Sequence, residues 1–181
     1  MSAPHFSPEI ASRMSRITAL VLDVDGVLTD GRIVYDEFGD ELKFFHVQDG
    51  TGLTLWHRAG LLSAMITARR SKMVERRAKE LQVDFVAQKA LSKFKAFEQF
   101  LKRFKLAPDQ VCAVGDDLME LPILRKVGLA VAVSNAVEEV KQAAHYVTTK
   151  EGGHGAVREV TELILKHKGL WNAITERYYT S

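Results

Sequence analysis

The stretch Leu20–Gly31, with the sequence LVLDVDGVLTDG, decides the fold of this chain. An apolar run typical of a buried parallel strand ends here in two carboxylates two residues apart, and a glycine follows that lets the backbone turn sharply. In an open α/β sheet, ligands bind in the crevice beyond the carboxyl ends of the strands. Asp and Gly are also ordinary turn residues, so an acidic turn is the simpler alternative. Because two acids follow a fully apolar strand so closely, we favour a functional site at Asp23 and Asp25.

Segments of strand length and helix length alternate along the rest of the chain. We expect strands at 17–24, 61–66, 84–86, 110–114, 129–133 and 145–148. We expect helices at 8–15, about 49–59, 71–81, 93–104, 118–127, 136–143 and 156–167, followed by an amphipathic segment at 170–179. Strands separated by helix-length segments indicate βαβ units. The predicted fold class is therefore α/β, a Rossmann-like doubly wound parallel sheet with helices on both faces.

The composition is that of one ordinary globular domain. With 181 residues, the chain can bury a core as a single domain over residues 1–181. The formal net charge is only +2, which gives no reason to expect nucleic acid or a membrane as a partner. The single cysteine, Cys112, lies in an apolar run, which excludes an internal disulfide and fits a reducing compartment. No stretch approaches the length of a membrane span, and the first residues lack the order of a signal peptide, so we expect a cytoplasmic protein.

Residues 32–47 form two β-rich runs around a turn that contains Gly39. A two-stranded hairpin is marginal when it stands alone in water, so its apolar residues need a cover. These residues are Ile33, Val34, Tyr35, Phe44 and Phe45. A second copy of the chain is the obvious supplier of that cover, and we therefore expect a homo-oligomer that assembles through the hairpin.

Chemically active groups follow several of the expected strands or begin the next helix. They are, in chain order, Asp23 with Asp25, Thr67, Lys93, and Asp116 with Asp117. A carboxylate can attack phosphorus, and a second acid can protonate the leaving alcohol and later activate water. A hydroxyl and an ammonium can hold the phosphoryl oxygens, while further carboxylates bind Mg²⁺. Taken singly, Thr67 would more often cap a helix and Lys93 would more often lie on the surface. Taken together, in register with the sheet, the groups predict phosphoryl transfer.

This order and spacing resembles the haloacid dehalogenase superfamily from Ile17 to about Lys168. Four strings are similar to those of the 3-deoxy-D-manno-octulosonate 8-phosphate (KDO 8-phosphate) phosphatases: DVDGVLTDG at 23–31, HVQDG at 46–50, GDD at 115–117 and GGHGAVRE at 152–159. The resemblance implies a Mg²⁺-dependent phosphatase that acts on a small acidic sugar phosphate through an aspartyl phosphate, in the synthesis of lipopolysaccharide precursors. It also implies a homotetramer.

The resemblance implies roles for individual residues. The catalytic residues would be Asp23 as nucleophile, Asp25 as acid and base, and Thr67 and Lys93 as phosphate ligands. The metal would be bound by the Asp23 carboxylate, the Asp25 carbonyl and Asp116. The substrate-binding residues would be Asp25, His46, Asp49, Gly50, Arg69, Arg77, Lys93 and His154. Of these, Arg69 and Arg77 suit the substrate carboxylate best, because arginine offers a rigid fork that matches it.

Spacing independently indicates a subclass without a cap domain. The segments from Asp25 to Thr67 and from Lys93 to Asp116 are used up by the elements already assigned, so no cap domain fits in either place. An active site without a cap stays open unless another subunit covers it, which agrees with the apolar hairpin.

The C-terminal tail, about 150–181, contains the densest glycine segment of the chain, at 150–156. The resemblance implies that this segment reaches the active site of a neighbouring subunit and helps to close it over substrate, and the plainer alternative is a linker that leads into a helix. Two residues depart from the family pattern. Glu120 stands where relatives often carry Asp, and His154 stands where they often carry Arg or Lys.

Two other functions remain open at this point. A phosphatase for a nine-carbon, sialic-acid-type 9-phosphate is the closest alternative, because both substrates are 2-keto acids with a terminal phosphate. A phosphoacceptor signalling domain also groups carboxylates, a threonine and a lysine at strand ends, but it places them in a different chain order. A non-catalytic oligomer with this fold would be expected to have lost one of the four groups, and none is missing.

Overall fold

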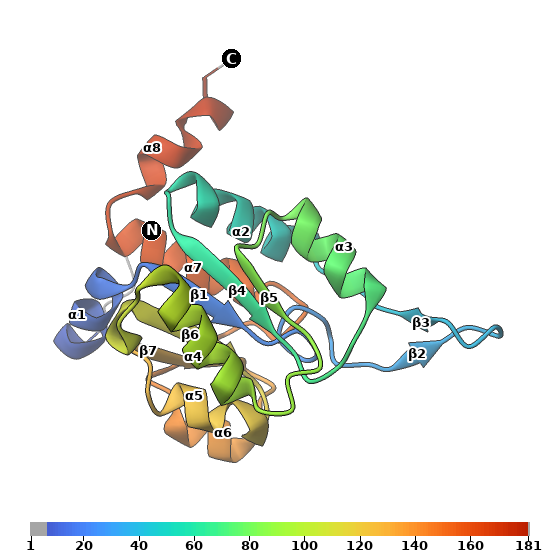
Figure 1. Cartoon of the computed structure of the whole chain (residues 1–181). Helices are drawn as coiled ribbons and strands as arrows, with labels where there is room; N and C mark the ends of the chain where they lie inside the picture. The colour runs from blue at the N-terminus through green and yellow to red at the C-terminus, as the bar shows by residue number, and fades with distance from the viewer. Residues whose placement is uncertain (1–6, 181) are drawn as a thin grey trace.

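The protein is described by a computed structural model that covers residues 7–180. Its centre is a parallel sheet with the strand order β5-β4-β1-β6-β7-β8 (Figure 1). The strands are β1 (Ala19–Leu22), β4 (Leu62–Ile66), β5 (Phe85–Ala87), β6 (Val111–Gly115), β7 (Leu129–Ala132) and β8 (Tyr146–Val147). Every neighbouring pair in this sheet is parallel, as the sequence predicts.

The apolar stretch that precedes Asp23 forms the central strand β1. All four of its residues are buried, because helices cover both faces of the sheet. Leu22, its last residue, is in register with Met65 of β4 on one side and with Val114 of β6 on the other. The three strands therefore end side by side, and the residues that follow them meet at one edge of the sheet.

The helices lie in two layers (Figure 1). One layer contains α1 (Pro8–Arg16), α2 (Val47–Arg58), α3 (Lys72–Glu80) and α7 (Ala156–His167), and the other contains α4 (Lys93–Phe104), α5 (Leu121–Leu124) and α6 (Glu138–Ala143). From β1 the chain first builds the sheet toward β5 and then crosses to β6 on the other side of β1. The point between β1 and β6 is thus the topological switch point, where doubly wound sheets bind their ligands.

The predicted helix bounds differ from the observed ones at several places, and two of the differences concern residues discussed below. The helix expected from residue 49 begins at Val47, so that Asp49 and Gly50 lie in the first turn of α2. The helix expected at 118–127 is a 3₁₀ turn, η2 (Leu118–Glu120), followed by the short α5. Pro122 accounts for the break, because proline has no N–H to donate and is favoured at the start of a new helix. The remaining short elements are η1 (Pro108–Gln110), α8 (Trp171–Thr175) and η3 (Glu176–Tyr178).

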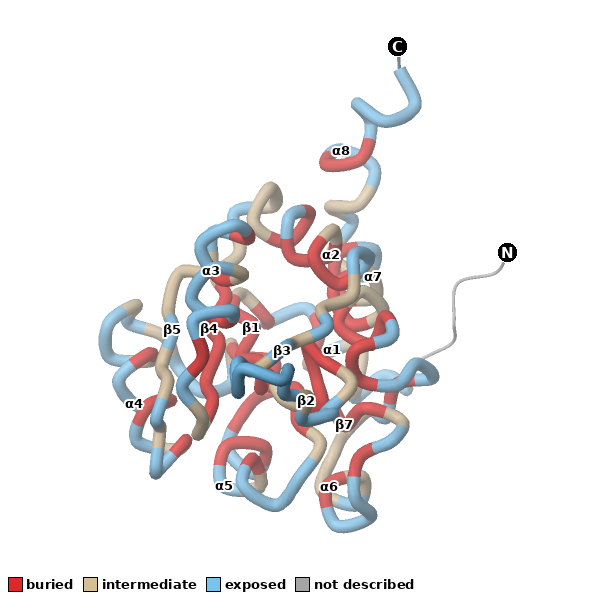
Figure 2. Tube along the Cα trace, turned by 90° about the vertical axis from the view of Figure 1, so that its right-hand side faces the viewer, coloured by how far each residue is buried: buried red, intermediate tan, exposed pale blue. Residues whose placement is uncertain are grey.

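The hairpin projects as a thin arm from the edge at which the strands of the sheet end (Figure 1), and most of it is coloured as exposed in Figure 2. Its strands, β2 (Val34–Tyr35) and β3 (Glu41–Leu42), have only two residues each, and a bridge between Thr29 and Phe45 closes the base of the arm. The exposed apolar residues are Ile33, Tyr35, Phe38, Leu42 and Phe44, and Phe38 at the tip is 84% exposed. Val34 and Phe45 differ from expectation, because both are partly buried and Phe45 packs against the core.

Two features concern the rest of the chain. Among residues 7–180, no helix is long and apolar enough to cross a membrane. Cys112 is fully buried in β6, where burial raises the pKa of its thiol.

Candidate active site

The residues that follow β1 and β6 meet at the switch point. Asp23 comes directly after β1, is 6% exposed, and its N–H donates to the carbonyl of Val114 (3.3 Å). Asp116 comes directly after β6. Its carboxylate lies against Gly26, where a Cβ would come within 2.0 Å of Asp116 Oδ2 and where φ is +96°. The turn after Asp25 therefore requires glycine both for its backbone conformation and for the room that Asp116 occupies.

Lys93 brings the only cation that touches this carboxylate cluster among the described residues. It is the first residue of α4, whose N-terminus is capped by the Ser92 hydroxyl. Its Nζ lies 2.5 Å from Asp23 Oδ1 and 2.5 Å from Glu120 Oε1. Such close pairing explains how a lysine can be buried, because a buried charge is tolerated only with partners. The sequence analysis left a surface position open for Lys93, and the structure excludes it.

Thr67 follows β4 at the same edge and is buried. Its hydroxyl oxygen accepts a hydrogen bond from the N–H of Arg69 (3.2 Å), so it holds the turn that carries this arginine.

Glu120 is folded back so that both of its oxygens are used. Oε1 accepts from Lys93, and Oε2 accepts from the N–H of Asp117 (3.0 Å). The side chain fits against Gly115, where a Cβ would lie 2.7 Å from Glu120 Cβ. Sequence reasoning treated Glu120 only as a departure from the family pattern. The Asp-x-x-Glu spacing of Asp117 and Glu120 is a capping-box signal that could have placed its carboxylate at this turn.

The cluster carries more negative than positive charge. Carboxylate oxygens of Asp23, Asp116 and Glu120 lie within 4.8 Å of one another, and Lys93 alone opposes them. Burial raises the pKa of Asp23 to about 7, against the opposing effect of Lys93, and Glu120 adds to the rise. Burial followed by repulsion from Asp23 and Glu120 raises the pKa of Asp116 to about 7. A hard divalent cation such as Mg²⁺ prefers carboxylate oxygens, so this donor set fits it.

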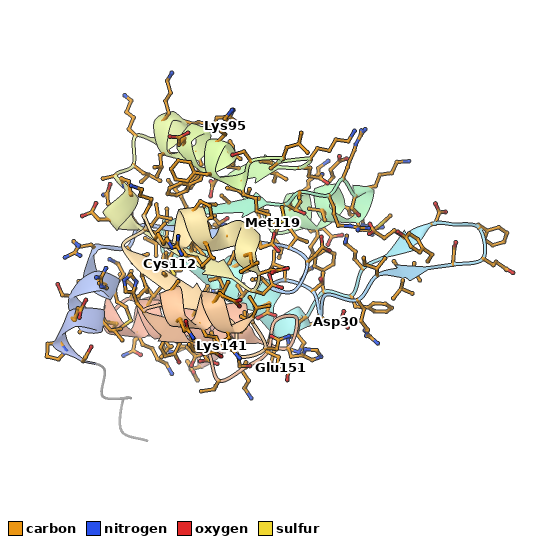
Figure 3. The ribbon with its side chains drawn as sticks, turned by 90° about the horizontal axis from the view of Figure 1, so that it is seen from below. Asp30, Lys95, Cys112, Met119, Lys141 and Glu151 are labelled. Atoms are coloured by element: carbon orange, nitrogen blue, oxygen red, sulfur yellow. The ribbon has the colours of Figure 1, made fainter. Side chains whose placement is uncertain are left out.

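Asp25 lies apart from that cluster and pairs with the hairpin. Its carboxylate accepts a hydrogen bond from Nζ of Lys43, whose side chain is only 3% exposed. Lys43 also lies 3.4 Å from a carboxylate oxygen of Glu41, which accepts a hydrogen bond from Arg69 (2.7 Å). Lys43 and Glu41 are site residues that the sequence analysis missed. The alternation of charged and apolar residues over 41–44 is the signal that could have found them. Figure 3 shows the hairpin extending from this edge, with Asp30 at its root.

Arg77 lies over Phe45 and Gly50. Its guanidinium carbon is 5.8 Å from the centre of the Phe45 ring, a cation–π distance. A Cβ on Gly50 would come within 2.3 Å of Arg77 Nη2, so glycine at this position makes room for the guanidinium. The structure therefore gives Gly50 an indirect place in the site, beneath Arg77.

Asp49 is 1% exposed and faces the interior of the protein. Its carboxylate accepts hydrogen bonds from the N–H groups of Gly155 (3.2 Å) and Arg158 (2.8 Å) at the start of α7. Four N–H groups at a helix start lack partners within the helix, so Asp49 acts as a cap supplied by another helix. The structure also brings His46 and His154 together, with their ring centres 6.5 Å apart.

The glycines of the tail pack within their own chain. A Cβ on Gly152 would come within 1.6 Å of the Gly26 carbonyl oxygen, and one on Gly153 within 2.3 Å of the Asp30 nitrogen. The N–H of Gly153 donates to the carbonyl of Val27 (2.9 Å). The sequence analysis assigned these glycines to a segment that closes over a neighbouring subunit. The structure packs Gly152 and Gly153 closely against the backbone of the loop at residues 26–30, and closure over a neighbouring subunit stays a prediction.

Comparisons with known proteins agree with this fold. The family model for haloacid dehalogenase-like hydrolases matches residues 76–160. The 3-deoxy-D-manno-octulosonate 8-phosphate phosphatase KdsC of Salmonella typhimurium strain LT2 is 42% identical over 163 residues, which are 90% of this chain and 87% of that protein.

Solved structures of other proteins are similar to this chain in both fold and sequence. A probable YrbI family phosphatase from Pseudomonas syringae pv. phaseolica has a TM-score of 0.93 and 40% identity, covering 97% of this chain and 99% of that one. The 3-deoxy-D-manno-octulosonate 8-phosphate phosphatase of Moraxella catarrhalis, solved with magnesium ion, phosphate ion and KDO, has a TM-score of 0.92 and 39% identity. It covers 96% of this chain and 99% of that one.

The fold and the carboxylate cluster at its switch point define a haloacid dehalogenase-like hydrolase. Within that class, the chain belongs to the 3-deoxy-D-manno-octulosonate 8-phosphate phosphatase family. The predicted family and the predicted α/β fold are confirmed.

Proposed function

We propose that the protein is a cytoplasmic Mg²⁺-dependent phosphatase that hydrolyses KDO 8-phosphate to KDO and phosphate, for the synthesis of lipopolysaccharide precursors. One hydrolase domain would carry the whole reaction. The observation that carries the proposal is the meeting of Asp23, Asp116 and Lys93 at the switch point of the sheet. The Moraxella catarrhalis relative, solved with magnesium, phosphate and KDO, supports both the cofactor and the eight-carbon product.

The reaction would proceed through Asp23. Its carboxylate attacks phosphorus, the bond from phosphorus to the sugar oxygen breaks, and Asp25 gives its proton to that oxygen. Asp25 then takes a proton from the water that attacks the aspartyl phosphate, which releases phosphate. Lys93 and the Thr67 hydroxyl hold phosphoryl oxygens. The carboxylates of Asp23 and Asp116 and the carbonyl of Asp25 would hold Mg²⁺, which stabilises negative charge on the phosphoryl group.

Substrate recognition would come from the groups around the mouth of the site. We propose that Arg69 and Arg77 bind the substrate carboxylate, because a guanidinium matches a carboxylate in shape and charge. The Arg69 guanidinium is bonded to Glu41 of the hairpin, and the Arg77 guanidinium lies over Phe45, where the hairpin joins the body of the protein. His46 and His154 would contact the sugar from the side of α7. We further propose that Gly50 acts by seating Arg77, and that Asp49 acts by fixing α7.

Side-by-side turnover of two sugar phosphates tests the proposed substrate. We expect the kcat/KM for KDO 8-phosphate to exceed the value for a nine-carbon, sialic-acid-type 9-phosphate. The reverse order would make the nine-carbon compound the substrate. A stable phosphorylated protein without turnover of either compound would instead support a phosphoacceptor domain.

Mg²⁺ should raise the melting temperature, and the rise should be larger at about pH 8 than at about pH 6. With a pKa of about 7, Asp23 and Asp116 bind protons below that pH, and those protons compete with the cation. Above it, the ionised carboxylates repel one another in the folded protein, and a bound cation relieves the repulsion. Differential scanning fluorimetry measures both effects. The variant Asp116→Asn should lose most of the rise, and a rise that is equal at both pH values would contradict the assignment.

We propose that the hairpin joins copies of the chain into a tetramer. A charge at Ile33 or Phe44, as in Ile33→Asp or Phe44→Asp, should weaken each contact by about 2 kcal/mol, about thirtyfold in dissociation constant, and lower activity with it. Phe45 is unsuitable for this test, because it packs against the core. Light scattering at micromolar concentration measures the assembly, with Glu37→Lys at the hairpin tip as a matched change of charge. A wild-type monomer at that concentration would exclude the proposal.

A further inference from the structure

The second run of the hairpin has a reversed pattern of charge and apolarity. Residues 41, 43 and 45 face the body of the protein, whereas Leu42 and Phe44 face outward and are exposed. A strand that packs on a core normally turns its apolar residues inward. Here two of the three inward residues, Glu41 and Lys43, are charged. Burial of a lysine is unfavourable without a compensating partner, so the inward position of Lys43 calls for an explanation.

The partner of Lys43 is the carboxylate of Asp25, the proposed acid and base. Among the hydrogen bonds and ion pairs of the described residues, the Asp25 carboxylate has no other partner. The Asp25 side chain is 26% exposed, so burial of its carboxylate does not by itself explain the contact with Lys43. The ammonium of Lys43 is in turn held from its other side by Glu41, 3.4 Å away.

Glu41 is itself anchored at its far end. Arg69 donates a hydrogen bond of 2.7 Å to Glu41. Burial raises the pKa of Glu41, but the hydrogen bond from Arg69 and the charge of Lys43 outweigh that effect, so the net shift is downward. The four side chains therefore form a row of alternating charge that runs from Asp25 through Lys43 and Glu41 to Arg69. The two inner residues, Lys43 and Glu41, each have an oppositely charged partner on both sides.

We propose that Lys43 is a positioning residue that holds the Asp25 carboxyl in the orientation from which it protonates the leaving oxygen. The proposal rests on the proposed function. Proton transfer requires the acid to lie within about 2.6–3.2 Å of the oxygen that receives the proton. A carboxyl group next to a glycine turn can rotate freely unless a fixed group holds it. Lys43 is fixed at the base of the hairpin and held by Glu41, so it can fix Asp25 in turn.

The variant Lys43→Met tests this through the leaving group. An alkyl phosphate needs a proton on its leaving oxygen, whereas 4-nitrophenyl phosphate releases a stable phenolate without one. The kcat/KM reports only the steps up to release of the leaving group, so later hydrolysis of the aspartyl phosphate does not affect it. We expect Lys43→Met to lower kcat/KM by about 10²-fold for KDO 8-phosphate and for glycerol phosphate, and by less than about threefold for 4-nitrophenyl phosphate.

Glycerol phosphate separates positioning from substrate binding, because it has an alkyl leaving group but no carboxylate. A loss confined to KDO 8-phosphate would overturn the proposal in favour of direct binding of the substrate carboxylate by Lys43. An equal loss on all three substrates would overturn it in favour of a purely structural role. Asp25→Asn should show the same selective pattern as Lys43→Met with a larger loss. Lys102→Met, on the exposed last turn of α4, is the matched control and should leave all three values unchanged.

Two further variants keep the test decisive if Lys43→Met is poorly folded. Lys43→Arg keeps the charge but changes its shape, and it should recover most of the alkyl-phosphate activity. Glu41→Gln releases the ammonium of Lys43 from one side, and it should give a smaller loss with the same selectivity. If the wild-type protein hydrolyses glycerol phosphate but not KDO 8-phosphate, the proposed substrate fails, and the alkyl-to-aryl comparison still decides the role of Lys43.

Discussion

Asp23→Asn is expected to lower kcat by at least about 10⁴-fold while the fold and the assembly stay intact. The amide has nearly the same shape as the carboxylate, but it cannot attack phosphorus. Its carbonyl oxygen can still accept a hydrogen bond from Lys93, and Lys93 keeps its charged partner in Glu120. The substitution also removes one negative charge from a buried cluster that holds more carboxylates than cations. We therefore expect the free energy of unfolding in the absence of Mg²⁺ to be unchanged or higher at neutral pH.

Two measurements check this result. Steady-state turnover of KDO 8-phosphate gives the loss of activity, and intact mass spectrometry after rapid quenching detects the aspartyl phosphate in the wild-type protein alone. Asp109→Asn is the matched control, because Asp109 is exposed in η1, before the start of β6 and therefore at the opposite end of that strand from Asp116. Activity of Asp23→Asn within a few-fold of wild type would remove Asp23 from the role of nucleophile.

Lys93→Met is expected to damage both activity and stability. The variant loses the ammonium that would hold a phosphoryl oxygen, so we expect kcat to fall by about 10²–10³-fold. It also leaves Asp23 and Glu120 buried without a cation, which should cost about 3–5 kcal/mol in the free energy of unfolding at about pH 8. The stability loss should shrink as the pH falls. Lys93 lowers the pKa of Asp23, so its removal raises that pKa further, and a protonated carboxyl needs no cation.

Urea denaturation at about pH 5.5 and about pH 8 measures this dependence on pH. The control is Lys102→Met in the same helix, which should change stability by no more than about 0.5 kcal/mol at either pH. A stability loss in Lys93→Met that is equal at both pH values, or larger at the lower one, would show that the ion pairs of Lys93 do not cause it.

Much of the catalytic edge could be predicted from the sequence, because the end of a buried strand can be recognised from the few residues around it. Asp23 and Asp116 follow apolar runs that could only be buried parallel strands, and Lys93 begins a clear amphipathic helix. A parallel sheet then brings these ends together whatever the details of packing. The catalytic roles of these residues remain predictions that the experiments above address.

The residues that the sequence analysis missed depend on contacts between distant segments. The alternation of charged and apolar residues over 41–44 marks two faces, but β3 has only two residues and ends before Lys43, so the alternation does not show which face turns inward. The role of Asp49 at the start of α7 depends on a hydrogen bond between residues that lie 109 positions apart in the chain. The glycines at 152 and 153 also suggested mobility, although the structure uses them for close approach of two backbones. The break at Pro122 is different, because proline chemistry alone could have predicted it.

The contact of Gly152 with the Gly26 carbonyl has a consequence for which parts of this protein can be exchanged. Because the loop at 26–30 is wedged between Asp116 and the tail, the floor of the site is a rigid part that tolerates little redesign. The hairpin contacts the rest of its own chain at few places, chiefly the Thr29–Phe45 bridge and the ion pairs of residues 41 and 43. Exchanging the outer hairpin, residues 33–40, for that of a relative should therefore alter how copies of the chain assemble, while the groups of the reaction centre stay in place. The molecule separates a fixed reaction centre from an exchangeable outer arm.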